Sequence, residues 1–561
     1  MITHLDLPVI LHNEKRGLLT VEDGRLDVLQ LSSDGRPPRR LLSSPLRNFL
    51  RAYLATSKPD QEQKNRRLDL HSLSQKDRTL RLVKLHVLVE PINVSEAERW
   101  VDNIMSASYG SIKPFRRVLL LVNPVGGKGK AKSIVHDAVM PILEAAGCVV
   151  DKRETTHRLH AEEIAREIEL DYDVIATSSG DGLVYEVING LAVRSDARRA
   201  LQIPVAPIPT GSANAVCINL FGVEDTFNIP LSCLNVIKGR RLPIDLCSVL
   251  LLPSMTRRFS FLSAATGLMV DLDIGTENLR WMGDARFTVG FLRGIVGNKG
   301  SKCRLKLKVV QDDKVEMARE AREQARVRKG TKVVGGGVNP LVNGVKTLGL
   351  NGGTSGSGMV QDHGDEVTPI SAADPDDDYV PDHGPIHAAK PLDPDSTWLT
   401  IESPTSKPTI KPKTNTARSL DTSAALSQNR NDWLDGQSVL YFYAGMMPWA
   451  ARDLNQWPVA IAGDGLIDVV VQSVVPRLTL VNAITGAAEG EAYWLDSQHY
   501  YKVSAIVAEN LDKANQPIFT IDGESFPWDS FHIELHRRIA NLLSLDGDFY
   551  ASNFVQKHEK K

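Results

Sequence analysis

The sequence predicts an α/β protein with an N-terminal half built on a parallel sheet and a mostly antiparallel, β-rich half that carries a disordered insert. Three observations lead to this fold class. Strand and helix patterns alternate between residues 115 and 245, whereas strand patterns dominate 246–308 and 433–550. The stretch between the two β-rich segments, 309–432, is rich in Gly, Ser, Pro and Asp and poor in apolar residues.

Composition sets limits on the class of protein. A chain of 561 residues is long enough for two to four domains, and its net charge of −2 gives no reason to expect nucleic-acid binding. The longest apolar runs are shorter than the roughly 20 residues that a spanning helix needs, and the first residues lack the pattern of a secretory signal. The five cysteines are scattered without metal-ligand spacing, which favours buried thiols in a reducing compartment. We therefore expect a soluble or peripheral protein of the cytoplasm.

Residues 1–114 form an N-terminal extension. Apolar residues alternate along 83–89, which predicts a half-buried strand, and a helix with an apolar face around Trp100 and Ile104 follows. Ser95 and Glu98 have the spacing of a capping box at the start of this helix. Strands closed by one helix with a buried Trp resemble a pleckstrin-homology-like module, and an extension without such a fold is the alternative.

Residues 115–245 alternate between the two periodicities as a parallel α/β unit does. The expected strands are 117–122, 149–154, 173–177 and 203–207, and the expected helices are 130–146, 160–169 and 182–192. The first strand is apolar throughout, as strands buried on both faces of a parallel sheet are.

The β-rich half is interrupted in the sequence but is expected to be continuous in space. Alternating patterns predict strands at 438–443, 468–472, 501–507 and 518–521. The insert of 309–432 begins with a charged stretch of helical pattern and continues into Gly-rich and acidic sequence, which cannot bury enough apolar surface to order itself. A surface loop without a role and a regulatory loop are both compatible with its Ser, Thr and Pro content.

A glycine-rich turn follows the first strand of the α/β unit. Residues 123–129 read NPVGGKG, and glycine lets backbone N–H groups close on phosphate oxygens while Lys128 supplies positive charge. The spacing is not that of a Walker loop, so this turn alone is a weak signal.

Two further turns strengthen this signal. The strand ending near residue 177 runs into Ser179, Gly180, Asp181 and Gly182, and residues 207–215 read PIPTGSANA after another buried strand. Open α/β sheets bind ligands at the carboxyl ends of their strands. We therefore expect the three turns to form one phosphate-binding edge, with the carboxylate of Asp181 at its mouth.

NPVGGKGK, SSGDGLVYEVINGL and PTGSANA resemble the catalytic region shared by diacylglycerol, ceramide and sphingosine kinases. The segment GLMVDLDIGTENLRWMGDARFTVG at 267–290 is specifically similar to the sphingosine, or long-chain base, kinases, and IDGESF at 521–526 fits as well. The resemblance covers about 115–308 and 433–550. The size of the insert and of the N-terminal extension suggests a fungal member.

The resemblance implies a two-domain kinase with ATP and Mg²⁺ in the cleft and a sphingoid base as substrate. Asp181 would be the general base, Asp273 and Glu277 would meet the lipid head group, and Ser179, Gly180 and Gly182 would line the substrate site. The positions carried over to the ATP site are Asn123, Pro124, Val125, Lys128, Thr155, Thr156, His157, Arg158, Leu159, Glu186, Gly211, Ser212, Ala213, Arg280, Arg286, Gly523 and Glu524. The chain departs from the family at Ala213, where a second glycine is common, and at 156–159, where a charged run is common; the latter departure puts the adenine-side contacts in doubt.

The chemistry of the residues agrees with this expectation. A primary alcohol that attacks a phosphoryl group must lose a proton, and a carboxylate such as Asp181 can accept it. A cationic amino-alcohol needs a second carboxylate, which Asp271, Asp273 or Glu277 could supply, although any of these acids could equally be a solvated strand end. The alternatives are a diacylglycerol or ceramide kinase, an inactive lipid-binding regulator and, least favoured, an NAD kinase.

The expected substrate lies in a bilayer, so peripheral membrane association is also expected. Apolar residues of 287–296 would share one helical face, with Lys302 and Arg304 close by, which suits docking on anionic lipid. A core helix is the alternative for this segment.

Overall fold

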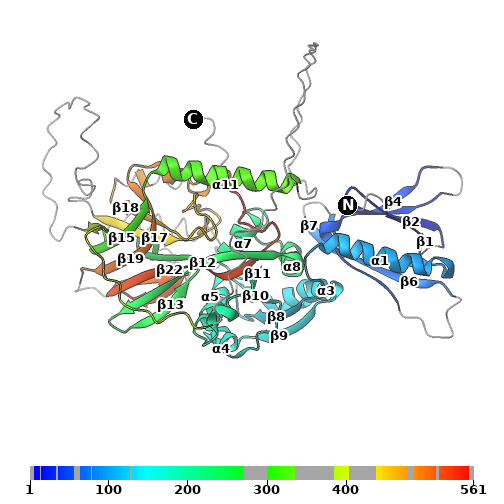
Figure 1. The fold of residues 1–561 in the computed structure, drawn as a ribbon, viewed down its shortest axis with the longest axis horizontal. Coiled ribbons are helices and arrows are strands. Elements are labelled where there is room, and N and C mark those ends of the chain that lie inside the picture. Colours follow the sequence, from blue (N-terminus) through cyan, green and yellow to red (C-terminus); the bar gives the residue numbers. More distant parts are fainter. Residues whose placement is uncertain are drawn as a thin grey trace, which may run out of the picture.

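The computed structural model describes residues 5–12, 14–32, 36–55, 64–76, 79–126, 129–270, 300–334, 384–403, 438–476, 479–480, 486–512 and 517–554. These residues form a seven-stranded sheet at the N-terminal end and a fifteen-stranded sheet that spans the rest of the protein (Figure 1). In the described residues, no helix is both long enough and apolar enough to cross a membrane.

The N-terminal module is an antiparallel sheet with one helix beside it (Figure 1). The strand order is β4-β3-β2-β1-β7-β6-β5, and helix α1 (Val94–Tyr109) buries Trp100 and Ile104 against the sheet core. The strands are β1 (Leu5–Ile10), β2 (Arg16–Glu22), β3 (Arg25–Gln30), β4 (Arg39–Pro45), β5 (Phe49–Leu54), β6 (Arg66–Lys76) and β7 (Thr79–Val89). The predicted capping box is wrong, because a 3₁₀ turn (Pro91–Asn93) precedes α1 and the N-cap is Asn93, not Ser95. The pleckstrin-homology-like assignment stays a prediction.

The module is joined to the next half through a shared core rather than through a bare linker. Leu50, Leu73 and Tyr109 of the module belong to the same buried cluster as Val236 of helix α8 (Ile229–Lys238). The buried ammonium of Lys238 donates to the carbonyl oxygens of Leu46 and Ser108, each at 3.0 Å. These contacts fix α8 against the module.

Residues 115–245, which we call the α/β half, have the predicted alternation of strands and helices. Its parallel strands are β8 (Arg117–Val122), β9 (Val149–Glu154), β10 (Val174–Ser179) and β11 (Val205–Pro209), in the order β11-β10-β8-β9. The helices are α2 (Ala131–Ile134), a π-helical turn (Val135–Val139), α3 (Met140–Ala145), α4 (His160–Glu167), α5 (Asp181–Ala192), α6 (Ala197–Ala200), α7 (Ala215–Phe221) and α8. Strands β8, β10 and β11 are almost wholly buried, which explains their apolar sequences.

The β-rich half continues the same sheet. Strand β22 (Ser530–Ser544) pairs antiparallel with β12 (Arg240–Leu252) and β19 (Gln498–Asn510), and it meets β11 in parallel where Val205 faces Leu542. Its other strands are β13 (Thr256–Ser260), β14 (Ser263–Gly267), β15 (Cys303–Gln311), β16 (Leu399–Glu402), β17 (Val439–Gly445), β18 (Ile467–Ser473), β20 (Ile518–Ile521) and β21 (Glu524–Pro527). Pairing among these strands is antiparallel, as predicted.

Parts of the predicted insert of 309–432 are ordered, which differs from the expectation of disorder for those parts. Helix α11 (Lys314–Val334) lies over the β-rich half (Figure 1), and Met317, Ala318 and Ala321 are buried in a cluster with Tyr441 and other residues of the sheet. After the undescribed residues 335–383, the chain returns and β16 pairs with β15. Both pieces are ordered because apolar side chains of the insert pack on the sheet.

Candidate active site

The three predicted turns lie side by side at the carboxyl edge of the parallel sheet, because β8, β10 and β11 are neighbours. Backbone hydrogen bonds join them: Asn123 N–H donates to Ser178 O and Thr210 N–H donates to Ser179 O, both at 3.1 Å. The hydroxyls of Ser178 and Thr210 are also within hydrogen-bond distance at 3.1 Å. The edge is therefore one connected structure, as the sequence predicted.

Two glycines bring the second and third turns into direct backbone contact. A Cβ added at Gly180 would lie 2.3 Å from Ala213 O, and one added at Gly211 would lie 2.1 Å from Gly180 N. Neither distance is compatible with a side chain, so glycine is required at both positions. A Cβ added at Gly182 would meet nothing within 4 Å, which leaves open space at the start of α5.

Asp181 lies at the junction of these turns and is buried, with 7% of its surface exposed. Its Oδ2 accepts the N–H of Ala215 at 2.7 Å and its Oδ1 accepts the N–H of Val216 at 3.1 Å. The carboxylate therefore caps helix α7, while its own N–H donates to Ala213 O at 3.1 Å. Burial raises the pKa of Asp181 and the two backbone bonds oppose that shift.

The turn after β9, residues 155–159, lies at the same edge. Thr155 N–H donates to Val122 O at 2.9 Å, and Leu159 has a left-handed backbone with φ of 64°. Thr156 N–H donates to His160 Nδ1 at 3.1 Å, and the ring of His157 contacts Glu163 at 3.0 Å. Thr156 and His157 thus bind the start of their own helix, α4.

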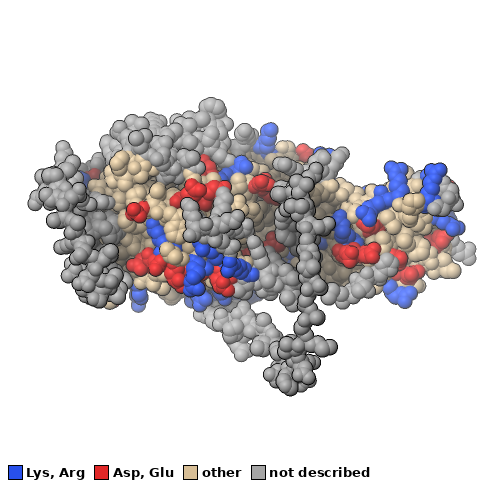
Figure 2. All heavy atoms as spheres, turned by 90° about the horizontal axis from the view of Figure 1, so that it is seen from above, with Lys and Arg blue, Asp and Glu red and all other residues tan. Residues whose placement is uncertain are grey.

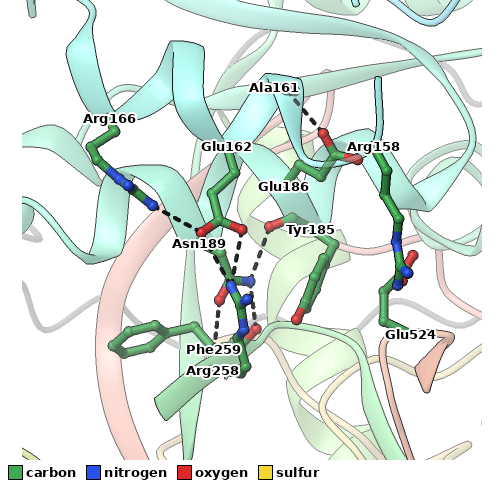
Figure 3. A network of polar contacts seen from close by, with 10 residues as sticks. All are labelled: Arg158, Ala161, Glu162, Arg166, Tyr185, Glu186, Asn189, Arg258, Phe259 and Glu524. Carbon is green, nitrogen blue, oxygen red and sulfur yellow. Dashed lines mark hydrogen bonds and ion pairs between the residues drawn. The ribbon is translucent and has the colours of Figure 1, made fainter. Parts of the chain in front are cut away.

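Glu186 and Arg158 connect this turn to other elements (Figure 3). Glu186, on α5, accepts the N–H of Ala161 at 2.9 Å and so caps α4; burial raises its pKa. Arg158 forms an ion pair with Glu524, which lies at the start of β21 in the β-rich half. Arg158 and Glu524 belong to opposite halves of the protein, and both are among the residues expected at the ATP site. Their ion pair therefore joins the two halves at this position.

The turn that carries Gly523 and Glu524 is held by a residue that the sequence analysis missed. The buried carboxylate of Asp522 accepts the Ser260 hydroxyl at 2.7 Å and the N–H groups of Phe261, Leu262 and Ser263 at 2.8–3.1 Å. Gly523 has φ of +84°, which favours glycine. The signal for Asp522 was its place directly before Gly523 in the IDGESF motif.

Several predicted site residues lie outside the described residues. They are Lys128 of the first turn, Asp273 and Glu277 of the predicted head-group site, and Arg280 and Arg286 of the predicted phosphate contacts. The remaining residues carried over to the ATP site, except Gly523 and Glu524, follow the carboxyl ends of strands β8, β9 and β11 or lie on α5. Val125 in the first turn is 81% exposed and so faces away from the core.

The backbone of this edge suits phosphate groups better than its carboxylates suit a directly bound metal ion. Close approach of the second and third turns leaves no side chains between Gly180 and Gly211, and backbone N–H groups near such turns are suited to phosphate oxygens. The carboxylates of Asp181, Glu186 and Glu524 already accept hydrogen bonds from the protein. A Mg²⁺ ion here would therefore be held mainly through phosphate oxygens and water, as Mg²⁺ sites commonly are.

One cluster of metal-ligating side chains lies elsewhere in the described part of the chain. Ligand atoms of His387, Glu534 and His536 are within 4.8 Å of one another. However, the guanidinium of Arg257 lies 3.2 Å from Nε2 of His536, where its positive charge would oppose a metal cation. We therefore assign no metal to this cluster.

A pocket adjoins the third turn. Ser212, Ala213, Asn214 and Phe227 line it from the α/β half, and residues 450–452 line it from the β-rich half. The pocket therefore lies where both halves meet beside α7.

The catalytic-domain model described as "Diacylglycerol kinase catalytic domain" matches residues 117–249, which contain all three turns. Sphingoid long chain base kinase 4 of Schizosaccharomyces pombe is 28% identical over 453 residues, which cover 80% of each chain. Sphingoid long chain base kinase 5 of Saccharomyces cerevisiae is 30% identical over 492 residues, which cover 84% of this chain and 66% of that one. Human sphingosine kinase 1 is 42% identical over 185 residues, or 32% of this chain and 48% of that protein.

The parallel sheet, its joined turns and the matched domain define a catalytic domain of the diacylglycerol kinase superfamily. Alignment with the fungal relatives extends well beyond that domain into both flanking regions. The chain belongs to the family of sphingoid long-chain base and sphingosine kinases.

Proposed function

We propose that this chain is an ATP- and Mg²⁺-dependent kinase that phosphorylates the primary hydroxyl of sphingoid long-chain bases and releases sphingoid-base 1-phosphates. The observation that carries the proposal is the position of Asp181, a buried carboxylate at the junction of three phosphate-compatible turns. The named relatives are sphingoid base kinases, which supports this substrate class over neutral lipids.

Asp181 acts as the general base in this proposal. The hydroxyl proton of the lipid passes to the carboxylate while the hydroxyl oxygen bonds to the γ-phosphorus, and the bond from that phosphorus to the β-γ bridging oxygen breaks, releasing ADP. Each carboxylate oxygen accepts one backbone N–H and retains a second lone pair for this proton. Burial raises the pKa of Asp181, which favours proton acceptance.

The remaining residues bind and orient. Backbone N–H groups around Gly211 and Ser212 would meet phosphate oxygens, and the turns at 155–159 and 523–524 would enclose the nucleotide from both halves. Bound Mg²⁺ supplies neutralisation of phosphate charge. Lys128, Arg280 and Arg286 are proposed phosphate contacts, and Asp273 and Glu277 are proposed contacts of the cationic head group.

Peripheral membrane association is a further part of the proposal, because the substrate resides in a bilayer. Residues 287–296, which supply the proposed apolar face, lie outside the described residues. Of the neighbouring cations, Arg304 is paired with Glu402 and Glu509, each at 2.8 Å, so it is a weaker candidate for lipid contact than Lys302. On the face drawn in Figure 2, Lys and Arg side chains also gather along one side of the N-terminal module. Arg39 and Arg40 of β4, in the same module, are exposed.

The proposal is tested with purified protein, labelled ATP and a panel of lipids: sphingosine, dihydrosphingosine, phytosphingosine, ceramide and diacylglycerol. We expect a labelled 1-phosphate from the sphingoid bases, and none from an Asp181→Asn variant that is still folded at the assay temperature. Label in phosphatidic acid or ceramide phosphate would instead make the chain a neutral-lipid kinase. Absence of label in every lipid, with ATP still bound, would support an inactive lipid-binding regulator.

A further inference from the structure

Two buried asparagines join the α/β half to the β-rich half in the same way. Asn189 of α5 donates from Nδ2 to Phe259 O and accepts the N–H of Phe259 at Oδ1, both at 2.9 Å (Figure 3). Asn219 of α7 makes the same pair of bonds with Trp449, again both at 2.9 Å. Each amide therefore satisfies the donor and the acceptor of one backbone residue, as a neighbouring strand would.

Each amide is also fixed on its own helix. The second N–H of Asn189 donates to Tyr185 O at 3.0 Å, and that of Asn219 donates to Ala215 O at 2.8 Å. The two residues are 1% and 0% exposed, so water does not compete for these bonds. Because each amide is hydrogen-bonded both to its own helix and to the β-rich half, it fixes the position of the helix relative to that half.

Both helices start at the proposed base. Helix α5 begins with Asp181 itself, and α7 begins with Ala215, whose N–H is bound by the Asp181 carboxylate. At about 1.5 Å per residue, Asn189 lies roughly 12 Å along α5 from Asp181, and Asn219 lies roughly 6 Å along α7 from Ala215. Helices α5 and α7 therefore connect Asp181 to two separate residues of the β-rich half, Phe259 and Trp449.

Phe259 and Trp449 each lie next to a segment of the candidate site. Phe259 immediately precedes Ser260, which binds Asp522 and so supports the turn of Gly523 and Glu524. Trp449 immediately precedes residues 450–452, which line the pocket beside the third turn. The ion pair between Glu162 and Arg258 adds a further link between α4 and β13, next to the hydrogen bonds between Asn189 and Phe259 (Figure 3).

We propose that Asn189 and Asn219 are positioning residues of phosphoryl transfer: they set the orientation of the lipid-holding half relative to Asp181 and to the nucleotide. The inference rests on the proposed function, because it assumes that one half holds the lipid and the other holds ATP. Neither asparagine touches the reacting atoms. Displacement of a reacting group by about 1 Å can cost on the order of 100-fold in rate, so small rotations of one half matter.

The test uses Asn189→Ala and Asn219→Ala in the full-length chain, with Asn235→Ala as a matched control. Asn235 is also a fully buried asparagine that joins a helix to the β-rich half, through Leu543 O at 2.8 Å. Its helix α8 starts at Ile229, after the N-cap Asn228, and not at one of the three turns. All three variants should lose stability, and Asn235→Ala should lose the least, because Asn189 and Asn219 each give up three buried side-chain hydrogen bonds and Asn235 gives up one. Activity is therefore compared per folded molecule. Only Asn189→Ala and Asn219→Ala should change the orientation of the β-rich half relative to Asp181.

Three quantities are measured: kcat per folded molecule, KM for ATP, and the number of ATP molecules consumed per lipid phosphorylated. We expect kcat of the Asn189 and Asn219 variants to fall about 10- to 100-fold with KM for ATP little changed, and more ATP to be lost to water per lipid product. Asn235→Ala should keep wild-type kcat and a stoichiometry of one. Equal behaviour of all three variants would reduce the two asparagines to a structural role.

A second pair of variants covers failure to fold. If the alanine variants do not fold, Asn189→Ser and Asn219→Ser, which retain a small polar group, are judged by the same ratio of ATP consumed to lipid phosphorylated, and an unchanged ratio overturns the inference. The wild-type chain separates this inference from the proposed function. If wild-type protein phosphorylates a lipid other than sphingosine, the function is corrected and the alignment test is carried out with that lipid.

Discussion

Asp181 Oδ2 lies 2.7 Å from the backbone nitrogen of Ala215 and accepts its hydrogen, so the proposed general base also caps helix α7. A single carboxylate thus connects proton transfer to the position of the third turn. This double role shapes the first prediction, because a substitution that removes the base also weakens the cap.

Asp181→Asn should abolish turnover while ATP still binds. The amide keeps the size of the carboxylate but cannot accept the hydroxyl proton, and loss of a general base costs roughly 10²- to 10⁴-fold in rate. One of the two bonds to α7 should also be lost, so thermal unfolding is recorded alongside lipid phosphorylation and nucleotide binding. A variant that retained more than about a tenth of wild-type activity would show that Asp181 is not the base.

Gly211→Ala should strongly destabilise the protein. The new methyl group would meet the backbone of Gly180 at 2.1 Å, and neither backbone can move without displacing the other turns. Overpacking of this kind costs about 1–3 kcal/mol of unfolding free energy, or more where backbone is involved. Denaturant unfolding measures the loss. Gly182→Ala is the control, since a Cβ there meets nothing within 4 Å and stability should hold or rise.

Disruption of the ion pair between Arg158 and Glu524 should affect nucleotide binding more than folding. The side chain of Arg158 is 73% exposed and that of Glu524 is 29% exposed, and exposed ion pairs contribute only about 0–1 kcal/mol to stability. We expect Arg158→Gln and Glu524→Gln each to raise KM for ATP severalfold with nearly unchanged melting temperatures. Unchanged KM for ATP in both variants would exclude this pair from the nucleotide site.

The fold was predictable where local pattern decides structure. Buried apolar strands followed by glycine turns placed residues 123–126, 179–182 and 210–214 at one edge, and the structure agrees. The parallel contact between Val205 and Leu542 was not predictable, because no local periodicity encodes the pairing of strands more than 300 residues apart. The apolar stripe of α11 was missed for a related reason: Met317, Ala318 and Ala321 are few among many charged residues, and the sheet that covers them is distant in sequence.

The residues of the candidate site also divide into those that could be predicted from the sequence and those that could not. Residues in glycine turns were identified from sequence, whereas the buried contacts that hold the turns were not. Asn219 and Asp522 each bind backbone groups of segments distant in sequence, Trp449 and residues 261–263 respectively. Such bonds depend on three-dimensional proximity alone, so no spacing rule reveals them.

Lys238, which is buried where α8 meets the N-terminal module, should make the stability of the protein rise with pH. Burial lowers the pKa of the Lys238 ammonium to about 7, with Arg47 adding to the shift, whereas an unfolded lysine has a pKa of about 10.4. Between these values the unfolded chain binds more protons than the folded chain, so the folded state gains stability as pH rises above about 7 and loses it as pH falls back toward 7. Below that pH both states carry the proton and this contribution levels off. Melting temperatures of wild type and Lys238→Met, recorded between about pH 6 and pH 9, should separate toward low pH, where the buried charge destabilises only the wild type, and converge toward high pH. Parallel curves would contradict this assignment.

Asp273→Ala should raise KM for sphingosine far more than KM for ATP. We propose that this carboxylate binds the ammonium end of the lipid, and a cationic amino-alcohol loses a charge-assisted bond when the carboxylate is removed. Asp273 lies outside the described residues, so kinetics rather than geometry must decide its role. Asp271→Ala, two residues earlier, is the matched control and should leave both constants near wild type if that acid is a solvated strand end. Equal loss for sphingosine and ATP in the Asp273 variant would make Asp273 a structural residue of the cleft instead of a head-group ligand.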